Sequence, residues 1–116
     1  MLVSLGLSAQ NLIGATRKDV EFMAAAHGWR TCKTNLKEGQ LLQVEQGDTL
    51  RFYYFRDELC TVSVIFYGGV PGSMIREMLN KNYSRNDTAW YSGNTVIKLL
   101  YDETLDGYFV KYRLVK

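Results

Sequence analysis

Residues 50–66 form the richest run of aromatic and β-branched side chains in the chain, and apolar and polar positions alternate with a period of two along its second half. This alternation predicts two antiparallel strands joined by a charged turn at Arg56-Asp57-Glu58. The second strand is expected to bury one set of side chains and to expose the alternate, mostly polar Thr61, Ser63 and Ile65; the buried set is Cys60, Val62, Val64 and Phe66. The first strand is apolar on both faces and leaves its orientation open, because Leu50, Phe52 and Tyr54 compete for the core with Tyr53 and Phe55.

Two stretches outside this hairpin have helical spacing. Thr16 is a good N-cap for a helix over residues 17–27, and Gly28 suits the left-handed position that follows a helix. A second helix is predicted to start at Pro71 or Ser73 and to end near Asn82, with an apolar stripe formed by Met74, Ile75, Met78 and Leu79.

Further strands are predicted at Trp29–Thr34, Leu41–Val44, Thr95–Tyr101 and Tyr108–Val115, with a polar loop over Tyr83–Thr88. The fold class is therefore α+β, in two layers: one antiparallel meander sheet with two helices on one face, in the order helix, three or four strands, helix, two or three strands. Both halves read as a helix followed by a meander, without a residue-level repeat. In this element order the chain resembles secretion-chaperone-like domains and small secreted inhibitor domains, a likeness that implies fold alone.

Composition adds limits rather than a function. The chain has 116 residues, 47% of them hydrophobic and 22% charged, which is typical of one globular domain. The formal net charge of +2 is too small to indicate nucleic acid as a partner. Arg51 and Arg56 flank four consecutive aromatic residues, but alternation sends half of these rings to the core, so no nucleic-acid binding is expected.

The first ten residues favour export. Met1–Ala9 is apolar and uncharged and ends in Ser-Ala, as the last part of a secretory signal peptide does. The alternative is a short native strand at Leu2–Leu5. We therefore divide the chain into a signal-peptide remnant or disordered start at 1–10 and a single α+β domain at 11–116. We expect a periplasmic or secreted protein, or alternatively a cytoplasmic one, and no transmembrane segment.

Cys32 and Cys60 are the two cysteines of the chain. In an oxidising compartment such a pair often forms a disulfide, so Cys32–Cys60 is a candidate bridge; a pair of buried free thiols is the alternative, and the sequence leaves the choice open. Two cysteines and one histidine without metal-ligand spacing indicate no metal site. No nucleophile elbow or phosphate-binding glycine motif is present, so we predict neither catalytic residues nor a cofactor.

These observations favour a small exported domain that binds a protein or a small ligand without catalysis. The predicted interaction face is the wetter face of the sheet, with Tyr53, Phe55, Trp90 and Tyr91, because interfaces are enriched in tyrosine and tryptophan. Homodimerisation through this face or a sheet edge is a variant. The alternative function is a cytoplasmic chaperone-like or adaptor domain that holds a partner segment.

Overall fold

The computed structural model describes residues 12–115. Over these residues, the first helix and four strands are α2 (Arg17–Ala26), β1 (Arg30–Leu36), β2 (Gly39–Gln46), β3 (Thr49–Arg56) and β4 (Leu59–Tyr67). The second helix and four strands are α3 (Gly72–Asn82), β5 (Ser84–Asn86), β6 (Ala89–Ser92), β7 (Thr95–Asp102) and β8 (Gly107–Leu114). The start at 1–10 lies outside the described residues.

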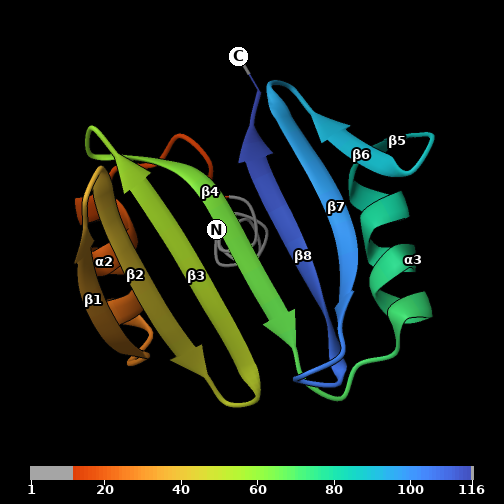
Figure 1. Cartoon of the computed structure of the whole chain (residues 1–116), viewed down its shortest axis with the longest axis horizontal. Helices are drawn as coiled ribbons and strands as arrows, with labels where there is room; N and C mark the ends of the chain where they lie inside the picture. Colours follow the sequence, from red (N-terminus) through yellow and green to blue (C-terminus); the bar gives the residue numbers. More distant parts are fainter. Residues whose placement is uncertain (1–11, 116) are drawn as a thin grey trace.

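All eight strands form one antiparallel sheet in the order β1-β2-β3-β4-β8-β7-β6-β5 (Figure 1). Each helix precedes a four-stranded meander, and the two meanders join where β4 pairs with β8. The predicted α+β class and meander sheet are confirmed. The polar loop predicted over Tyr83–Thr88 is wrong in part, because β5 pairs there with β6 as a short edge strand.

Local sequence signals explain where the helices begin and end. The backbone N–H of Asp19 donates to Thr16 Oγ1 at 3.2 Å, which satisfies one of the free donors at the start of α2. Gly28 has φ +71°, the left-handed conformation that ends the helix at low cost. The second helix begins at Gly72 with Pro71 as its N-cap, between the two predicted starts at Pro71 and Ser73.

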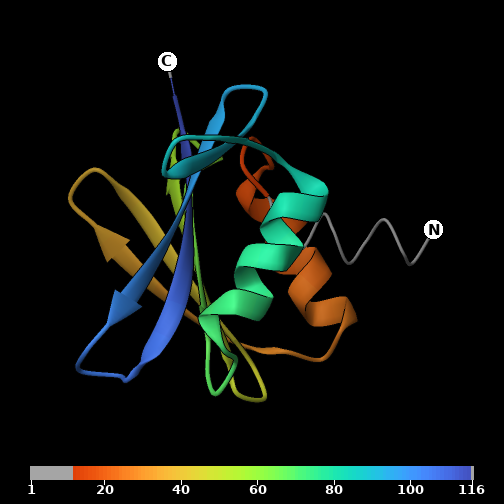
Figure 2. The ribbon, with the colours of Figure 1, turned by 90° about the vertical axis from the view of Figure 1, so that its right-hand side faces the viewer.

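Both helices lie on the same side of the sheet, which we call the helix face (Figure 2). Two apolar clusters fill the space between the layers. Beneath α2, Val20 and Ala24 pack with side chains from β2, β3 and β4, namely Leu42, Val44, Tyr53, Phe55 and Cys60. Beneath α3, Ile75 and Leu79 pack with side chains from β4, β6, β7 and β8, namely Ile65, Trp90, Ile97, Val110 and Tyr112.

A β-bulge in β4 decides which side chains reach this core. Tyr54 pairs with Val62 and Phe55 pairs with Cys60, so Thr61 is an extra residue opposite β3. One extra residue reverses the inward and outward positions of every residue beyond it. The prediction that Val62, Val64 and Phe66 face the core is therefore wrong; beyond Cys60 the buried residues are Ser63 and Ile65.

The residues of β3 alternate between the two faces of the sheet, and burial shows which set faces the helices. Arg51, Tyr53 and Phe55 are buried on the helix face. Leu50, Phe52 and Tyr54 lie on the opposite side of the sheet and are only partly buried. The strand thus places an arginine in the interior and leaves three large apolar side chains outside it.

Candidate functional site

The predicted interaction face does not exist as one surface. Tyr53, Phe55 and Trp90 are buried on the helix face, each with no more than 2% of its surface exposed. The Trp90 indole N–H also donates to Asn80 Oδ1 at 2.8 Å, which ties it to α3. Tyr91 points to the other side of the sheet and is 42% exposed. Three of the four residues therefore serve the core, because their strands turn these rings toward the helices.

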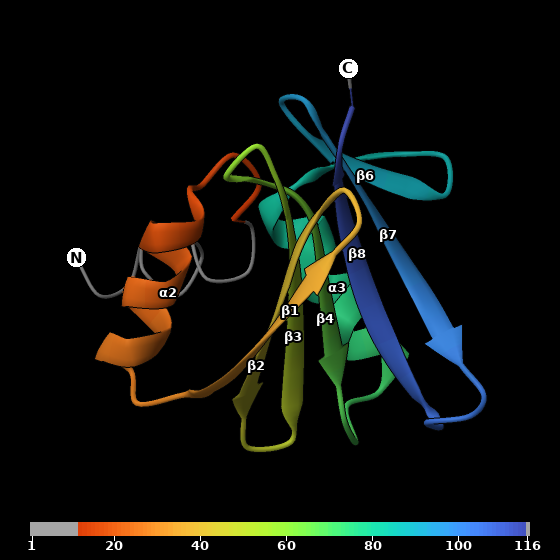
Figure 3. The ribbon, with the colours of Figure 1, turned by 60° about the vertical axis from the view of Figure 1, so that its left-hand side comes forward.

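The candidate Cys32–Cys60 bridge is not formed in this structure, where both cysteines are free thiols. Cys32 lies on the edge strand β1, in the foreground of Figure 3, and Cys60 lies on β4, three strand positions away. Three strand spacings amount to about 14 Å, well beyond the Cα separation of a disulfide. Cys32 is exposed, whereas burial raises the pKa of the Cys60 thiol to about 12.

The side of the sheet that faces away from the helices, which we call the open face, carries the strongest candidate site. Strand alternation and register place its side chains in rows across β2, β3, β4, β8 and β7. One row is Glu45, Leu50, Phe66, Phe109 and Leu100; the next is Gln43, Phe52, Val64, Lys111 and Lys98; the third is Leu41, Tyr54, Val62, Arg113 and Val96. The centre of the open face is therefore apolar, and cations lie at one side of it.

Two glycines let aromatic rings lie flat against the open face. A Cβ atom added to Gly107 would stand 2.6 Å from Cζ of Phe66. A Cβ added to Gly39 would stand 3.0 Å from the Tyr54 ring and 2.3 Å from the Phe55 carbonyl oxygen. The rings thus cover backbone where other side chains would lift them away, which explains why they are half-buried although no helix covers them.

Three cations stand together on β7 and β8 at the margin of this apolar surface. Lys98 and Lys111 are directly opposite each other, and Arg113 is two residues along the strand from Lys111. A hollow of about 320 Å³ lies between them, lined by Val96, Lys98, Leu100, Lys111 and Arg113. Its walls hold no carboxylate, so the charge there is positive.

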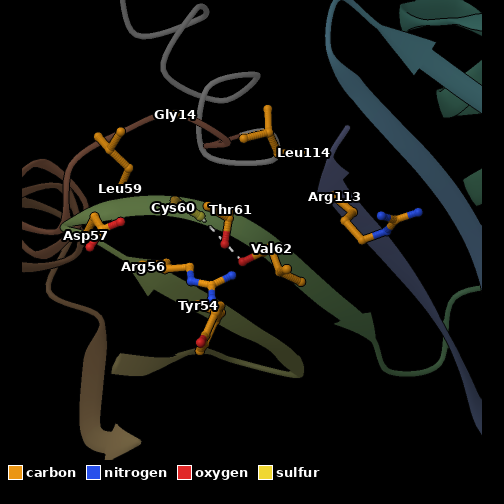
Figure 4. Close-up of a pocket in the computed structure, with 10 residues that line it drawn as sticks. All are labelled: Gly14, Tyr54, Arg56, Asp57, Leu59, Cys60, Thr61, Val62, Arg113 and Leu114. Atoms are coloured by element: carbon orange, nitrogen blue, oxygen red, sulfur yellow. Dashed lines mark hydrogen bonds between the residues drawn. The ribbon is translucent and has the colours of Figure 1, made fainter. Parts of the chain in front are cut away.

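A second hollow of about 760 Å³ lies at the end of the open face, beside the bulge (Figure 4). Tyr54, Val62 and Arg113 line it from the open face. The rest of its lining comes from the β3–β4 turn, the bulge and the end of the sheet: Gly14, Arg56, Asp57, Leu59, Cys60, Thr61 and Leu114. Arg113 belongs to both hollows and joins them. The two hollows therefore meet at Arg113 on β8.

A polar layer separates the two apolar clusters on the helix face. Arg51 is only 8% exposed; it donates to Gln46 Oε1 at 2.9 Å and stands 5.1 Å from the centre of the Trp29 ring. Burial raises the pKa of Tyr53 to about 12, although the charge and hydrogen bond of Arg51 oppose this rise. Burial also raises the pKa of Tyr67 and Tyr112. These hydroxyls stay protonated at neutral pH, so the layer carries a single formal charge.

Within residues 12–115 there is no group of three or more His, Cys, Asp or Glu side chains placed to hold a metal ion. In the same part of the chain, neither helix has the length and hydropathy needed to cross a membrane. The single histidine, His27, stacks on Trp29 with ring centres 4.5 Å apart, and its Nδ1 lies 2.9 Å from the Met23 carbonyl oxygen.

Over residues 12–115, fold and site together define a two-layer α+β domain in which one sheet face has an apolar centre and is covered by neither helix. The chain matches no family model, no curated protein and no solved structure. Its function must therefore be inferred from the open face itself. The sequence did carry one signal of this site: β3 is apolar at every position from Phe52 to Phe55, which a strand with one wet face does not need.

Proposed function

We propose that the protein is a non-enzymatic binding domain that docks a partner protein on the open face. The observation that supports this most directly is the continuous apolar centre of that face. Phe52, Val64, Phe66 and Phe109 lie on three adjacent strands, and none of them belongs to the two clusters beneath the helices. Contiguous apolar surface of this kind is characteristic of protein interaction sites.

A protein partner fits this surface better than a small ligand does. The two hollows of the open face are about half open to solvent, whereas small-molecule sites enclose most of their ligand. Aromatic side chains at the centre and polar ones at the margin are the usual anatomy of a protein interface. Leu100 and Tyr91 extend the surface toward β6 and are 39% and 42% exposed.

Export is part of this proposal and depends on residues 1–10. The alternative, a cytoplasmic chaperone-like or adaptor domain, would use the same open face to hold a segment of its partner. Cell fractionation followed by N-terminal sequencing separates the two settings. An exported protein would be recovered outside the cytoplasm with a new N-terminus after Ala9, and a cytoplasmic one would retain residues 1–9.

Site-specific photocrosslinking tests the docking surface. The photoreactive residue p-benzoylphenylalanine replaces Phe52 or Phe109 on the open face, and Phe22 in a control. Phe22 is 76% exposed on α2, so the control keeps the chemistry and moves it to the other side of the molecule. In producing cells we expect adducts with one defined partner from Phe52 and Phe109 and none from Phe22.

The adduct masses decide between outcomes. A crosslink between two copies of this chain would show that the open face binds a second copy, as a homodimer, and not a different partner protein. Equal adducts from all three positions, or adducts from Phe22 alone, would contradict docking on the open face. A thermal melt of each variant shows whether it is folded before any result is counted.

A further inference from the structure

We propose that Lys98, Lys111 and Arg113 form an anion site on the open face, which selects a partner segment bearing aspartate or glutamate side chains. This inference rests on the proposed function and adds the chemical class of the partner. In this inference the three cations determine which partner segment binds, and the apolar centre of the open face supplies most of the contact area.

The geometry of the three cations is unfavourable in the isolated chain. Lys98 and Lys111 form a directly opposed cross-strand pair, in which Cβ atoms are about 5 Å apart and like charges destabilise the sheet. Arg113 is the diagonal neighbour of Lys98, at about 7 Å. A bound anion would convert this repulsion into attraction.

No carboxylate among the described residues forms an ion pair with this cluster; the nearest one in a shared hollow is Asp57, which lines the larger hollow together with Arg56 and Arg113. The ion pairs of residues 12–115 involve Arg17, Arg30, Lys33 and Arg56, and none includes the three cations. The neighbouring strand β4 presents Val62, Val64 and Phe66 on the open face. On β7 itself, Asp102 lies four residues from Lys98, and its carboxylate accepts from the Leu105 N–H at 3.0 Å.

The surroundings of the cluster favour a carboxylate side chain of a protein. Val96 and Leu100 form apolar walls beside the cations, and Phe109 continues the apolar surface toward the centre of the face. An extended segment that alternates apolar and acidic residues could place both kinds of side chain on this surface. Aliphatic walls of this kind offer little to a fully hydrated phosphate backbone.

Charge complementarity also argues against a second copy of this chain as the occupant. The strands at the centre of the open face, β3 and β4, carry no acidic residue between Leu50 and Arg56 or between Leu59 and Tyr67. Glu45, which is on the open face of β2, already faces Arg30 at 3.7 Å. A copy that docks its β3 and β4 on the cations would thus bring apolar or basic side chains to them rather than counter-charge.

Three matched peptides test the inference. They share the same leucine and phenylalanine positions and carry glutamate, glutamine or lysine at the others. Binding is measured by fluorescence anisotropy and located by amide chemical shifts of the whole chain. The double variant K98Q/K111Q removes the opposed pair, and K18Q/K37Q removes the same charge from exposed positions on α2 and in the β1–β2 turn.

We expect the glutamate peptide to bind the wild-type chain at least tenfold more tightly than the lysine peptide, with shifts on β7 and β8. The preference should fall about fivefold to tenfold in K98Q/K111Q and stay unchanged in K18Q/K37Q, because charges at an interface margin act on selectivity and are screened by salt. The thermal midpoint of K98Q/K111Q at low salt should equal or exceed that of the wild type.

Other outcomes overturn the inference in distinguishable ways. Equal binding of all three peptides to the open face would leave docking intact and remove the anion site. If no peptide binds, the acidic-segment inference fails, and crosslinking from Phe52 and Phe109 still decides docking by itself. If a single-stranded oligonucleotide of equal charge displaces the glutamate peptide, the three cations form a general anion site. That result would contradict the inference that they select an acidic protein segment.

Discussion

Val64 and Ile65 are neighbours on β4 whose truncation tests the bulge and, with it, the open face. Ile65 is fully buried on the helix face, opposite Val110 and in the cluster that includes Ile75 and Leu79. Val64 lies on the open face and is partly buried. We expect Ile65→Ala to destabilise the protein several times more than Val64→Ala, the reverse of what uninterrupted alternation predicts.

The magnitudes follow from how much apolar surface each side chain buries. Ile65→Ala removes three carbon groups at about 0.8 kcal/mol each and leaves a cavity, for a loss of about 3 kcal/mol. Val64→Ala removes two groups from a half-buried position, for a loss of about 1 kcal/mol. A domain of this size is stable by about 5–15 kcal/mol, so both variants should remain folded.

Urea unfolding followed by tryptophan fluorescence measures both losses. With a slope of about 1.5 kcal/mol per molar, the midpoint should fall by about 2 M for Ile65→Ala and by less than about 1 M for Val64→Ala. Val64→Thr keeps the β-branch and controls for strand propensity. A larger loss of stability for Val64→Ala than for Ile65→Ala would refute the bulge. In that case β4 would present its polar side, with Thr61 and Ser63, on the open face.

Three further outcomes follow from the same structure. In native protein Cys32 should react with a thiol reagent while Cys60 does not, and both should react in denaturant. Because the pKa of Tyr53 is raised to about 12, its contribution to stability is complete below pH 10 and lost as the pH rises toward 12, costing about 1 kcal/mol at pH 11. Gly107→Ala should cost about 1–3 kcal/mol, because its Cβ would displace the Phe66 ring.

Each of these outcomes has a measurement that can contradict it. Intact mass after alkylation counts the thiols, and a protein with no reactive thiol even in denaturant without reductant would show a Cys32–Cys60 disulfide. Urea unfolding at pH 9 and pH 11 measures how much stability is lost between the two pH values, and this loss should be smaller for Tyr53→Phe than for the wild type. An equal loss would show that a group other than Tyr53 causes it. An unchanged stability of Gly107→Ala would show that the Phe66 ring does not rest on that glycine.

The helices could be predicted from the sequence because their signals are local. Thr16 with Asp19, and Gly28 after the last turn, define α2 within a dozen residues, and Pro71 marks the start of α3. The meander could be predicted for the same reason, since its turns are short and each strand pairs mainly with its neighbours in sequence.

The faces of the strands could not be predicted so well, because they depend on pairing. Whether Thr61 is a bulge is decided by its register with β3, and no residue type there marks it. The prediction of the interaction face was wrong for this reason. Whether Tyr53 and Phe55 point outward depends on which side of the sheet the helices cover, and the sequence does not show that side. The disulfide failed because the spacing of Cys32 and Cys60 along the chain does not reveal the two strands between β1 and β4.

The bulge gives the open face its chemistry. Without the extra residue, β4 would present Ser63 and Ile65 beside Phe52 and would turn Val64 and Phe66 inward. With it, Ser63 is buried, its hydroxyl lacks a hydrogen-bond partner among the described residues, and the two larger side chains stay half outside. Both changes oppose the hydrophobic effect in an isolated domain. Departures from local consistency are expected at functional sites, so a partner that covers the open face is the simplest physical account of this register.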